Sequence, residues 1–234
     1  SSSFGGWDVK LSPIFAARVI AGLIIIVWIA VLVPEQGHSS TAPAAIGTVK
    51  EIRSGTLERQ DKDLWKPLAA GMVISSNDRV RTGADGLAVL ALNDIGAVLI
   101  GPGTEYYLGD PSRGFKTLLK RGYLWISAKL SPGRTMSVAT TNAVTGVRGT
   151  KFSVIQDAAG TGVCTCKGAV EVSLRDGKTM NVTSGMYGAV DASGKMEPPD
   201  KGKPHLEKIW KERLARYAPC LNCHKKGKKI GDLN

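Results

Sequence analysis

Two short runs, "GLAVLAL" at residues 86–92 and "GAVLI" at residues 96–100, decide the fold class of this chain. Apolar and small residues recur in them over strand-like lengths, and turn signals bound them. Four further runs have the same character: "TVKEI" (48–52), "KFSVI" (151–155), "GAVEVSL" (168–174) and "KTMNV" (178–182). Asp176-Gly177 joins the last two as a tight hairpin does. We therefore predict an all-β domain of short strands, with no helix, over residues 46–192.

Composition indicates an ordered, turn-rich protein with room for one ordinary domain and appendages. The 234 residues are 43% hydrophobic and include 28 Gly and 11 Pro. The formal net charge is +11, and residues 201–234 hold ten basic against three acidic residues. The chain contains neither a P-loop, nor a Gly-x-Gly-x-x-Gly motif, nor a serine-nucleophile elbow. We predict a protein that is not an enzyme and that has no nucleic-acid partner.

Changes in composition divide the chain into six parts. Pro, Ser, Thr and Ala enrich residues 34–45, and Gly, Pro and Lys enrich residues 193–204, so both read as linkers. The predicted order is a cytoplasmic N-terminus (1–13), a transmembrane helix (14–33), a linker (34–45), the β domain (46–192), a second linker (193–204) and an amphipathic helix with a haem-binding tail (205–234).

The apolar segment Ile14 to Val33 has the length of a membrane span. Twenty helical residues extend about 30 Å, the thickness of the hydrocarbon core of a bilayer. Its one charge, Arg18, lies near the N-terminal end, and Lys10 precedes it, which predicts an N-terminus in the cytoplasm. A cleaved signal peptide is the alternative. We expect a single-pass protein of the bacterial inner membrane whose main body is periplasmic.

The sequence Cys220-Leu221-Asn222-Cys223-His224 has the pattern that attaches a c-type haem. Two thioether bonds from Cys220 and Cys223 hold such a haem, and His224 then lies beneath the iron as its ligand. A disulfide between the two cysteines, or half of a zinc site, are the alternatives. We predict one covalently bound haem c, with Cys220, Cys223 and His224 as its binding residues.

Residues 47–190 resemble a FecR-type domain, a module named after the periplasmic half of ferric-citrate signalling regulators. The matching stretches are "GTVKEIRSG" (47–55), "WKPLAAGMVISSNDRVRTGADGLAVLAL" (65–92), "AVTGVRGTKFSV" (143–154) and "TGVCTCKGAVEVS" (161–173). The resemblance implies an all-β roll or sandwich that acts as a binding or scaffolding module. A sigma-regulating member carries a sizeable cytoplasmic domain before its membrane segment, whereas thirteen residues precede Ile14 here. We therefore expect no role in transcriptional signalling.

Several other residues are candidates for a site. Arg148 is expected to bond strand-end carbonyl groups or, less readily, to bind an anion. Cys164 and Cys166 share one face of a strand and are expected to be small buried apolar residues rather than a metal or redox pair. Neither Met nor His follows His224, so the sixth haem ligand is left open among His38, Met186, Met196, a lysine of the tail or a residue of a partner.

The amphipathic stripe and the basic tail suggest contact with other proteins. In residues 204–217, apolar side chains recur at spacings of three and four, at Leu206, Ile209, Trp210, Leu214 and Tyr217. This stripe either packs on the β domain or covers the haem or a neighbouring subunit. The lysines around the haem motif are suited to a redox partner with an acidic surface, or to solvent and anionic lipid.

These observations together predict a membrane-anchored periplasmic monohaem cytochrome that transfers electrons as a subunit of a larger respiratory or photosynthetic membrane complex. Its predicted partners are the other subunits of that complex and the lipid bilayer around residues 14–33. The alternative is an envelope scaffold or assembly subunit whose FecR-like domain binds partner proteins, with the haem structural or absent.

Covalent attachment of haem is directly testable. Because thioether bonds survive denaturation, we expect the haem to remain with the chain in a denaturing gel and the intact mass to exceed the sequence mass by one haem. Replacing Cys220 and Cys223 together by Ser should return the mass to that of the bare chain. A wild-type mass equal to that of the bare chain contradicts the prediction.

Overall fold

The structure is a computed structural model that describes residues 43–111, 114–147 and 149–201. This part of the chain is all-β, as the sequence predicts. No helix within it is long and apolar enough to cross a membrane. The predicted transmembrane helix (14–33) and the predicted helical tail (205–234) both lie outside the described residues.

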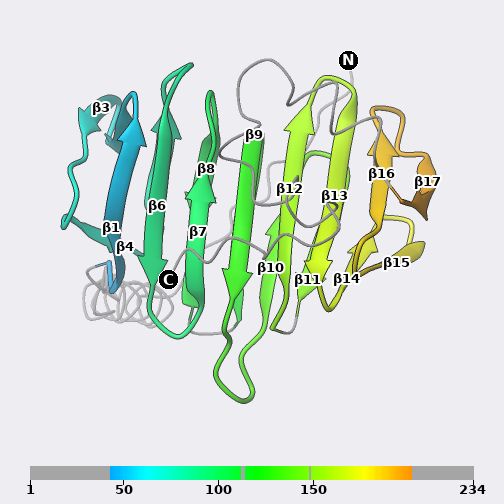
Figure 1. The fold of residues 1–234 in the computed structure, drawn as a ribbon. Helices are drawn as coiled ribbons and strands as arrows, with labels where there is room; N and C mark the ends of the chain where they lie inside the picture. The colour runs from blue at the N-terminus through cyan, green and yellow to red at the C-terminus, as the bar shows by residue number, and fades with distance from the viewer. Residues whose placement is uncertain (1–42, 112–113, 148, 202–234) are drawn as a thin grey trace, which may run out of the picture. The chain divides into compact units, whose positions relative to one another are not determined.

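The described strands form two sheets that share one strand (Figure 1). Sheet A has the order β4 (Val73–Ser75), β1 (Ala45–Ser54), β6 (Leu87–Leu92), β7 (Gly96–Ile100), β9 (Phe115–Ala128), β12 (Lys151–Asp157), β13 (Gly160–Lys167), β16 (Tyr187–Asp191), β17 (Met196–Asp200). Sheet B has the order β3 (Leu64–Pro67), β2 (Leu57–Asp61), β5 (Arg79–Thr82), β8 (Glu105–Leu108), β9, β10 (Met136–Ala139), β11 (Val144–Val147), β14 (Ala169–Ser173), β15 (Thr179–Thr183). Neighbouring strands are antiparallel except for the parallel pair β9 and β10.

Strand β9 is the central strand of both sheets. Its first half pairs with β8 and β10 in sheet B, and its second half pairs with β7 and β12 in sheet A. The two halves meet at Gly122, whose φ of +98° is a conformation that favours glycine. A Cβ atom at this position would lie 2.5 Å from the Cα of Thr104. The close approach and the backbone conformation together require glycine where the strand passes from one sheet to the other.

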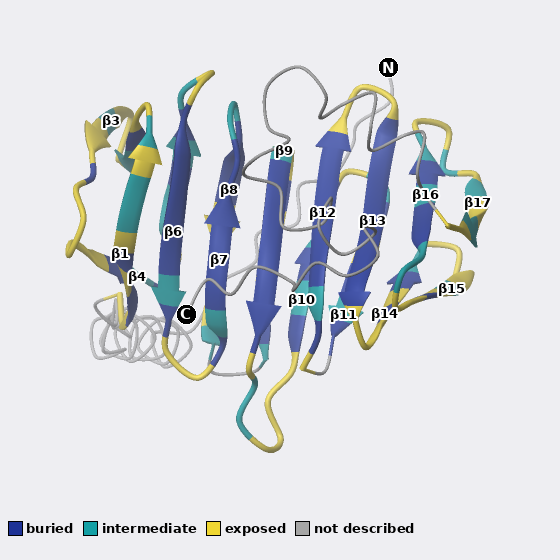
Figure 2. Ribbon diagram, in the orientation of Figure 1, coloured by how far each residue is buried: buried dark blue, intermediate teal, exposed yellow. Residues whose placement is uncertain are grey.

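The main hydrophobic core lies between the two sheets. Alternation along β6 directs Ala88, Leu90 and Leu92 into it, and alternation along β9 adds Leu124 and Ile126. The opposite face of sheet A carries a second cluster of buried residues, drawn mainly from the same strands. Figure 2 shows the result, in which the central strands of sheet A are buried along most of their length. Because these strands are buried on both faces, their sequences are continuous apolar runs.

The six runs that the sequence identified as strands are strands, namely β1, β6, β7, β12, β14 and β15. Gly177, with φ of +85°, turns the chain between β14 and β15, and the Leu174 amide donates to the Lys178 carbonyl, which confirms the predicted hairpin. Strand β17, however, lies within residues 193–204, which the sequence assigned to a linker. It occupies the edge of sheet A, where proline is tolerated because an outward amide has no ladder partner to lose.

Replacing Gly122 by Ala should destabilise the protein strongly. The Cβ atom meets backbone at Thr104, and the positive φ adds strain, so we expect a loss of about 3 kcal/mol or more in the free energy of unfolding. Gly133→Ala is the matched control, because Gly133 also has a positive φ of +79° but has open space around its Cα. We expect about 1–2 kcal/mol there. Urea unfolding followed by tryptophan fluorescence measures both, and equal losses would contradict the role given to Gly122.

Candidate functional site on the outer face of sheet B

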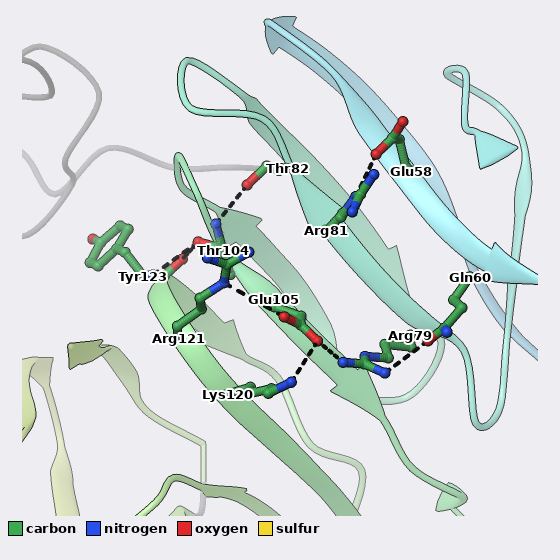
Figure 3. A network of polar contacts seen from close by, with 10 residues as sticks. All are labelled: Glu58, Gln60, Arg79, Arg81, Thr82, Thr104, Glu105, Lys120, Arg121 and Tyr123. Atoms are coloured by element: carbon green, nitrogen blue, oxygen red, sulfur yellow. Dashed lines mark hydrogen bonds and ion pairs between the residues drawn. The ribbon is translucent and has the colours of Figure 1, made fainter. Parts of the chain in front are cut away.

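Charged side chains gather on the outer face of sheet B where β2, β5, β8 and β9 lie side by side (Figure 3). Trp65 of β3, the neighbour of β2, lies against the arginines of β5. In β5, the sequence Arg79-Val80-Arg81-Thr82 alternates, so that Val80 and Thr82 are buried and the two arginines face outward. We call this surface the arginine–tryptophan face and define it by Glu58, Trp65, Arg79, Arg81, Glu105, Lys120 and Arg121.

Opposite charges follow one another across four strands of this face. The strand registers pair Glu58 with Arg81, Arg81 with Glu105, and Glu105 with Arg121. Arg81 Nε lies 2.6 Å from Glu58 Oε2, and Arg121 Nε lies 3.6 Å from Glu105 Oε2. Cross-strand pairs of opposite charge stabilise a sheet and favour its register. The row therefore fixes the order of these side chains on the surface.

Glu105 is the buried centre of this charge network. Its side chain is 9% exposed and receives contacts from three cations: a hydrogen bond from Arg79, and ion pairs with Lys120 at 3.4 Å and Arg121 at 3.6 Å. The side chains of Lys120 and Arg121 are 61% and 63% exposed. The carboxylate is thus covered by cations whose outer surfaces face solvent. Such an arrangement leaves positive charge available to an acidic ligand.

Trp65 provides an aromatic surface for the arginines of β5. The guanidinium carbon of Arg81 lies 4.2 Å from the centre of the indole ring, and that of Arg79 lies 5.7 Å from it. Both distances fall within the range of cation–π attraction. Because Arg79 also donates to Gln60 at 2.9 Å and Arg81 to Glu58, each guanidinium is held in place from two sides. Preorganised arginines lose less side-chain entropy when they bind a partner.

Two buried threonines hold the backbone beneath the charges. Thr104 Oγ1 accepts from the Tyr123 amide at 2.9 Å and lies 3.2 Å from the Tyr123 carbonyl oxygen, directly after Gly122. Thr82 Oγ1 accepts from the Thr104 amide at 3.0 Å and donates to the Gly101 carbonyl. These bonds tie β5, β8 and β9 together next to Glu105 and Arg121. The bend of β9 and the charge network therefore depend on the same contacts.

A hollow of about 450 Å³ adjoins the network, lined by Gln60, Lys62, Asn77, Arg79, Glu105, Tyr106, Tyr107, Leu118 and Lys120. Tyr107 and Leu118 are 38% and 40% exposed, so the hollow combines cations with apolar surface. The Tyr107 hydroxyl donates to Asn77 Oδ1 at 2.9 Å, which fixes the ring. Exposed apolar side chains beside arginines are typical of protein-binding surfaces.

The site residues that the sequence singled out lie elsewhere. Cys220, Cys223 and His224 fall outside the described residues, as do Arg148 and His38. Cys164 and Cys166 are buried in the cluster on the outer face of sheet A, which confirms that they share one face of a strand. Met186 and Met196, considered as haem ligands, both pack against the main core. In the part of the chain that the structure describes, no group of three or more His, Cys, Asp or Glu could hold a metal ion.

Sequence reasoning did not find the arginine–tryptophan face. The only local signal is the alternation of Arg79 and Arg81 around a buried valine, which predicts two arginines on one face of a strand. Trp65, Glu105 and Arg121 lie far from them in sequence and join them only through strand pairing. Nonlocal register of this kind leaves no pattern in a single stretch of sequence.

The middle of this domain matches a known protein family. The family described as "FecR protein" matches residues 78–171, which include β5, β8 and β9. No curated protein sequence matches this chain. Two crystal structures of a proposed anti-sigma factor from Parabacteroides distasonis, at 1.65 and 2.50 Å resolution, align with a TM-score of 0.47 and 20% identity. Each alignment covers 52% of this chain and 58% of the other, so it spans less than two thirds of that protein. A FecR domain is present in this chain, as the sequence resemblance predicted.

The FecR match corrects the predicted function. The haem-attachment pattern at residues 220–224 predicts an electron-transfer subunit of a respiratory or photosynthetic complex. The domain that makes up most of the described residues is instead of a kind named for signalling regulators, which favours the alternative of a partner-binding envelope protein. The thirteen residues before Ile14 therefore do not exclude a role in signalling.

Replacing Glu105 by Gln should cost more stability than breaking an exposed ion pair. The neutral amide leaves Arg79, Lys120 and Arg121 without their shared counter-charge at a side chain only 9% exposed, so we expect a loss of about 1–3 kcal/mol. Asp61→Asn is the control, because Asp61 and Lys66 form an ion pair in which both side chains are largely exposed. Urea unfolding of the two variants checks this, and equal stability of Glu105→Gln and wild type contradicts it.

Proposed function

We propose that this chain is an envelope regulatory or scaffold protein whose FecR domain binds another protein through the arginine–tryptophan face. The observation that carries the proposal is the stacking of Arg79 and Arg81 against Trp65, beside a hollow with exposed apolar side chains. Tryptophan and arginine are the residues most enriched at the energetic centres of protein interfaces.

The charge of this face indicates the kind of partner. Four cations, Arg79, Arg81, Lys120 and Arg121, surround the two carboxylates of Glu58 and Glu105. Glu105 lies beneath the cations, whereas Glu58 is 27% exposed and pairs with Arg81 at the surface. Lys120 and Arg121 are the most exposed of these side chains, so the surface presents positive charge around apolar groups. A partner segment that combines Asp or Glu with an apolar side chain would match it. Salt should weaken such binding, because exposed charges are screened.

We propose further that the domain lies outside the cytoplasm, anchored by residues 14–33. Lys10 and Arg18 support this orientation, because basic residues are retained on the cytoplasmic side of a membrane span. In this proposal, the haem predicted at Cys220, Cys223 and His224 is a structural group of the tail. A protease added outside the inner membrane of intact spheroplasts should digest the β domain, and protection of that domain would show the reverse orientation.

The binding face can be tested by crosslinking in cells. A photoreactive benzoylphenylalanine in place of Leu118, an exposed residue of the hollow that adjoins the face, should capture a partner in the full-length protein. Adding Arg81→Glu should lower the crosslinked fraction at least tenfold, because the reversed charge repels an acidic partner and loses the contact with Trp65.

Arg175→Glu is the matched control. Arg175 is exposed at the turn between β14 and β15, at the opposite end of sheet B, and its reversal changes the net charge of the protein by the same amount. We expect crosslinking to stay within twofold of wild type there. Equal crosslinking in the Arg81→Glu and wild-type backgrounds would contradict the proposed face.

A further inference from the structure

The outer face of sheet A carries a row of buried side chains, apolar except for Ser153, that crosses six strands. Strand registers place Val89 opposite Leu99, Leu99 opposite Trp125, and Trp125 opposite Ser153. The row continues from Ser153 to Cys164 and from Cys164 to Tyr187. Five spacings between neighbouring strands make it about 24 Å long. The row is therefore one continuous surface, built from β6, β7, β9, β12, β13 and β16.

These side chains are shielded, although no described element lies over them. Val89, Leu99 and Trp125 are each 0% exposed, yet every residue of their cluster belongs to sheet A itself. A sheet buries the side chains of one face only against a second layer. The indole nitrogen of Trp125 is also buried and has no hydrogen-bond acceptor within the described residues. The face thus requires a cover that supplies apolar side chains and an acceptor.

One end of this row has an acidic rim. A hollow of about 120 Å³ there has Ile155, Gly162 and Tyr187 among its lining, with Asp157, Asp191 and Glu197 at its border. Burial raises the pKa of the Tyr187 phenol, and the charges of Asp157 and Glu197 raise it further, as expected for carboxylates close to the ring. The cover therefore needs basic residues beside its apolar ones at the β16 end.

We propose that residues 204–217 of this chain form the second layer on the outer face of sheet A. Their stripe supplies bulky apolar side chains, Trp210 among them, and Lys201, Lys203, Lys208 and Lys211 lie before or within it to face the acidic rim. As a helix, the fourteen residues extend about 21 Å, close to the length of the row.

The path of the chain supports this occupant. Asp200 is the last residue of β17 and lies opposite Tyr187 in the register of β16 and β17. The chain therefore leaves sheet A at the acidic end of the row. Residue 204 is four residues further on and needs no long connection to reach the face. The apolar segment 14–33, the main competitor within the chain, contains a single charge at Arg18 and would leave the acidic rim unmatched. A second copy of sheet A would present a cluster without basic residues to the acidic rim.

Thiol labelling of the full-length protein in detergent tests the inference, because Cys164 and Cys166 lie on the covered face. Trp210→Asp places a charge in the stripe, and we expect it to raise the maleimide labelling rate of Cys164 and Cys166, read by peptide mass spectrometry, at least tenfold. Ala215→Asp is the matched control, since residue 215 lies on the opposite side of a helix from the stripe. Its labelling rate should stay within twofold of wild type. Unchanged labelling in Trp210→Asp overturns the proposal.

A second measurement covers the case in which Trp210→Asp unfolds the protein. Benzoylphenylalanine in place of Trp210 keeps an aromatic side chain and should crosslink within the same chain to peptides that contain Leu99, Trp125 or Cys164. The same probe in place of Ala215 should give no such crosslink. Crosslinks between two copies would assign the cover to a second molecule, and crosslinks of these peptides to the same probe placed at Trp28 would assign it to residues 14–33. Either result would overturn the proposal.

Discussion

The fold depends on one constraint, which is that β9 is the central strand of two sheets at once. Four strands from residues before β9 and four from residues after it join each sheet, and β9 connects all of them. The passage between sheets is possible because Gly122 adopts a positive φ and lets the backbone of Thr104 approach closely. Thr104 in turn bonds both backbone groups of Tyr123. A single bend thus sets the relative position of both halves of the domain.

The same bend gives the two outer faces different chemistry. Before Gly122, the outward residues of β9 include Leu118 and Lys120, which adjoin the arginines of β5 and the carboxylate of Glu105. After it, the outward residues include Tyr123 and Trp125, which belong to the buried apolar cluster of sheet A. A polar face on one sheet and an apolar face on the other offer two independent surfaces for contact. One strand therefore contributes to a site suited to an acidic partner and to a face that requires a cover.

The sequence predicted the class of fold better than the site, and the reason is physical. Runs such as 86–92 and 96–100 are apolar on both faces, because both faces of sheet A are buried, and this pattern is visible locally. Strand β9 was not predicted because its sequence follows no single pattern. Buried and exposed residues alternate in its first half, its second half is buried throughout, and Gly122 lies between them. The arginine–tryptophan face escaped notice because Glu58, Glu105 and Arg121 meet through registers of distant strands. Nothing in the described residues bears on the predicted haem residues, which stay a prediction.

The central position of β9 has a consequence for the order in which the domain can form during synthesis. Until residues 115–128 have left the ribosome, β7 and β8 are both edge strands with unpaired backbone groups, one in each sheet. When β9 arrives it covers both edges, and it then presents two new edges that β10 and β12 take up. While β9 emerges from the ribosome, the unpaired edges of β7 and β8 can therefore pair with strands of other chains. Translation speed around Phe115 to Ala128 should therefore influence how much of the protein reaches its folded state.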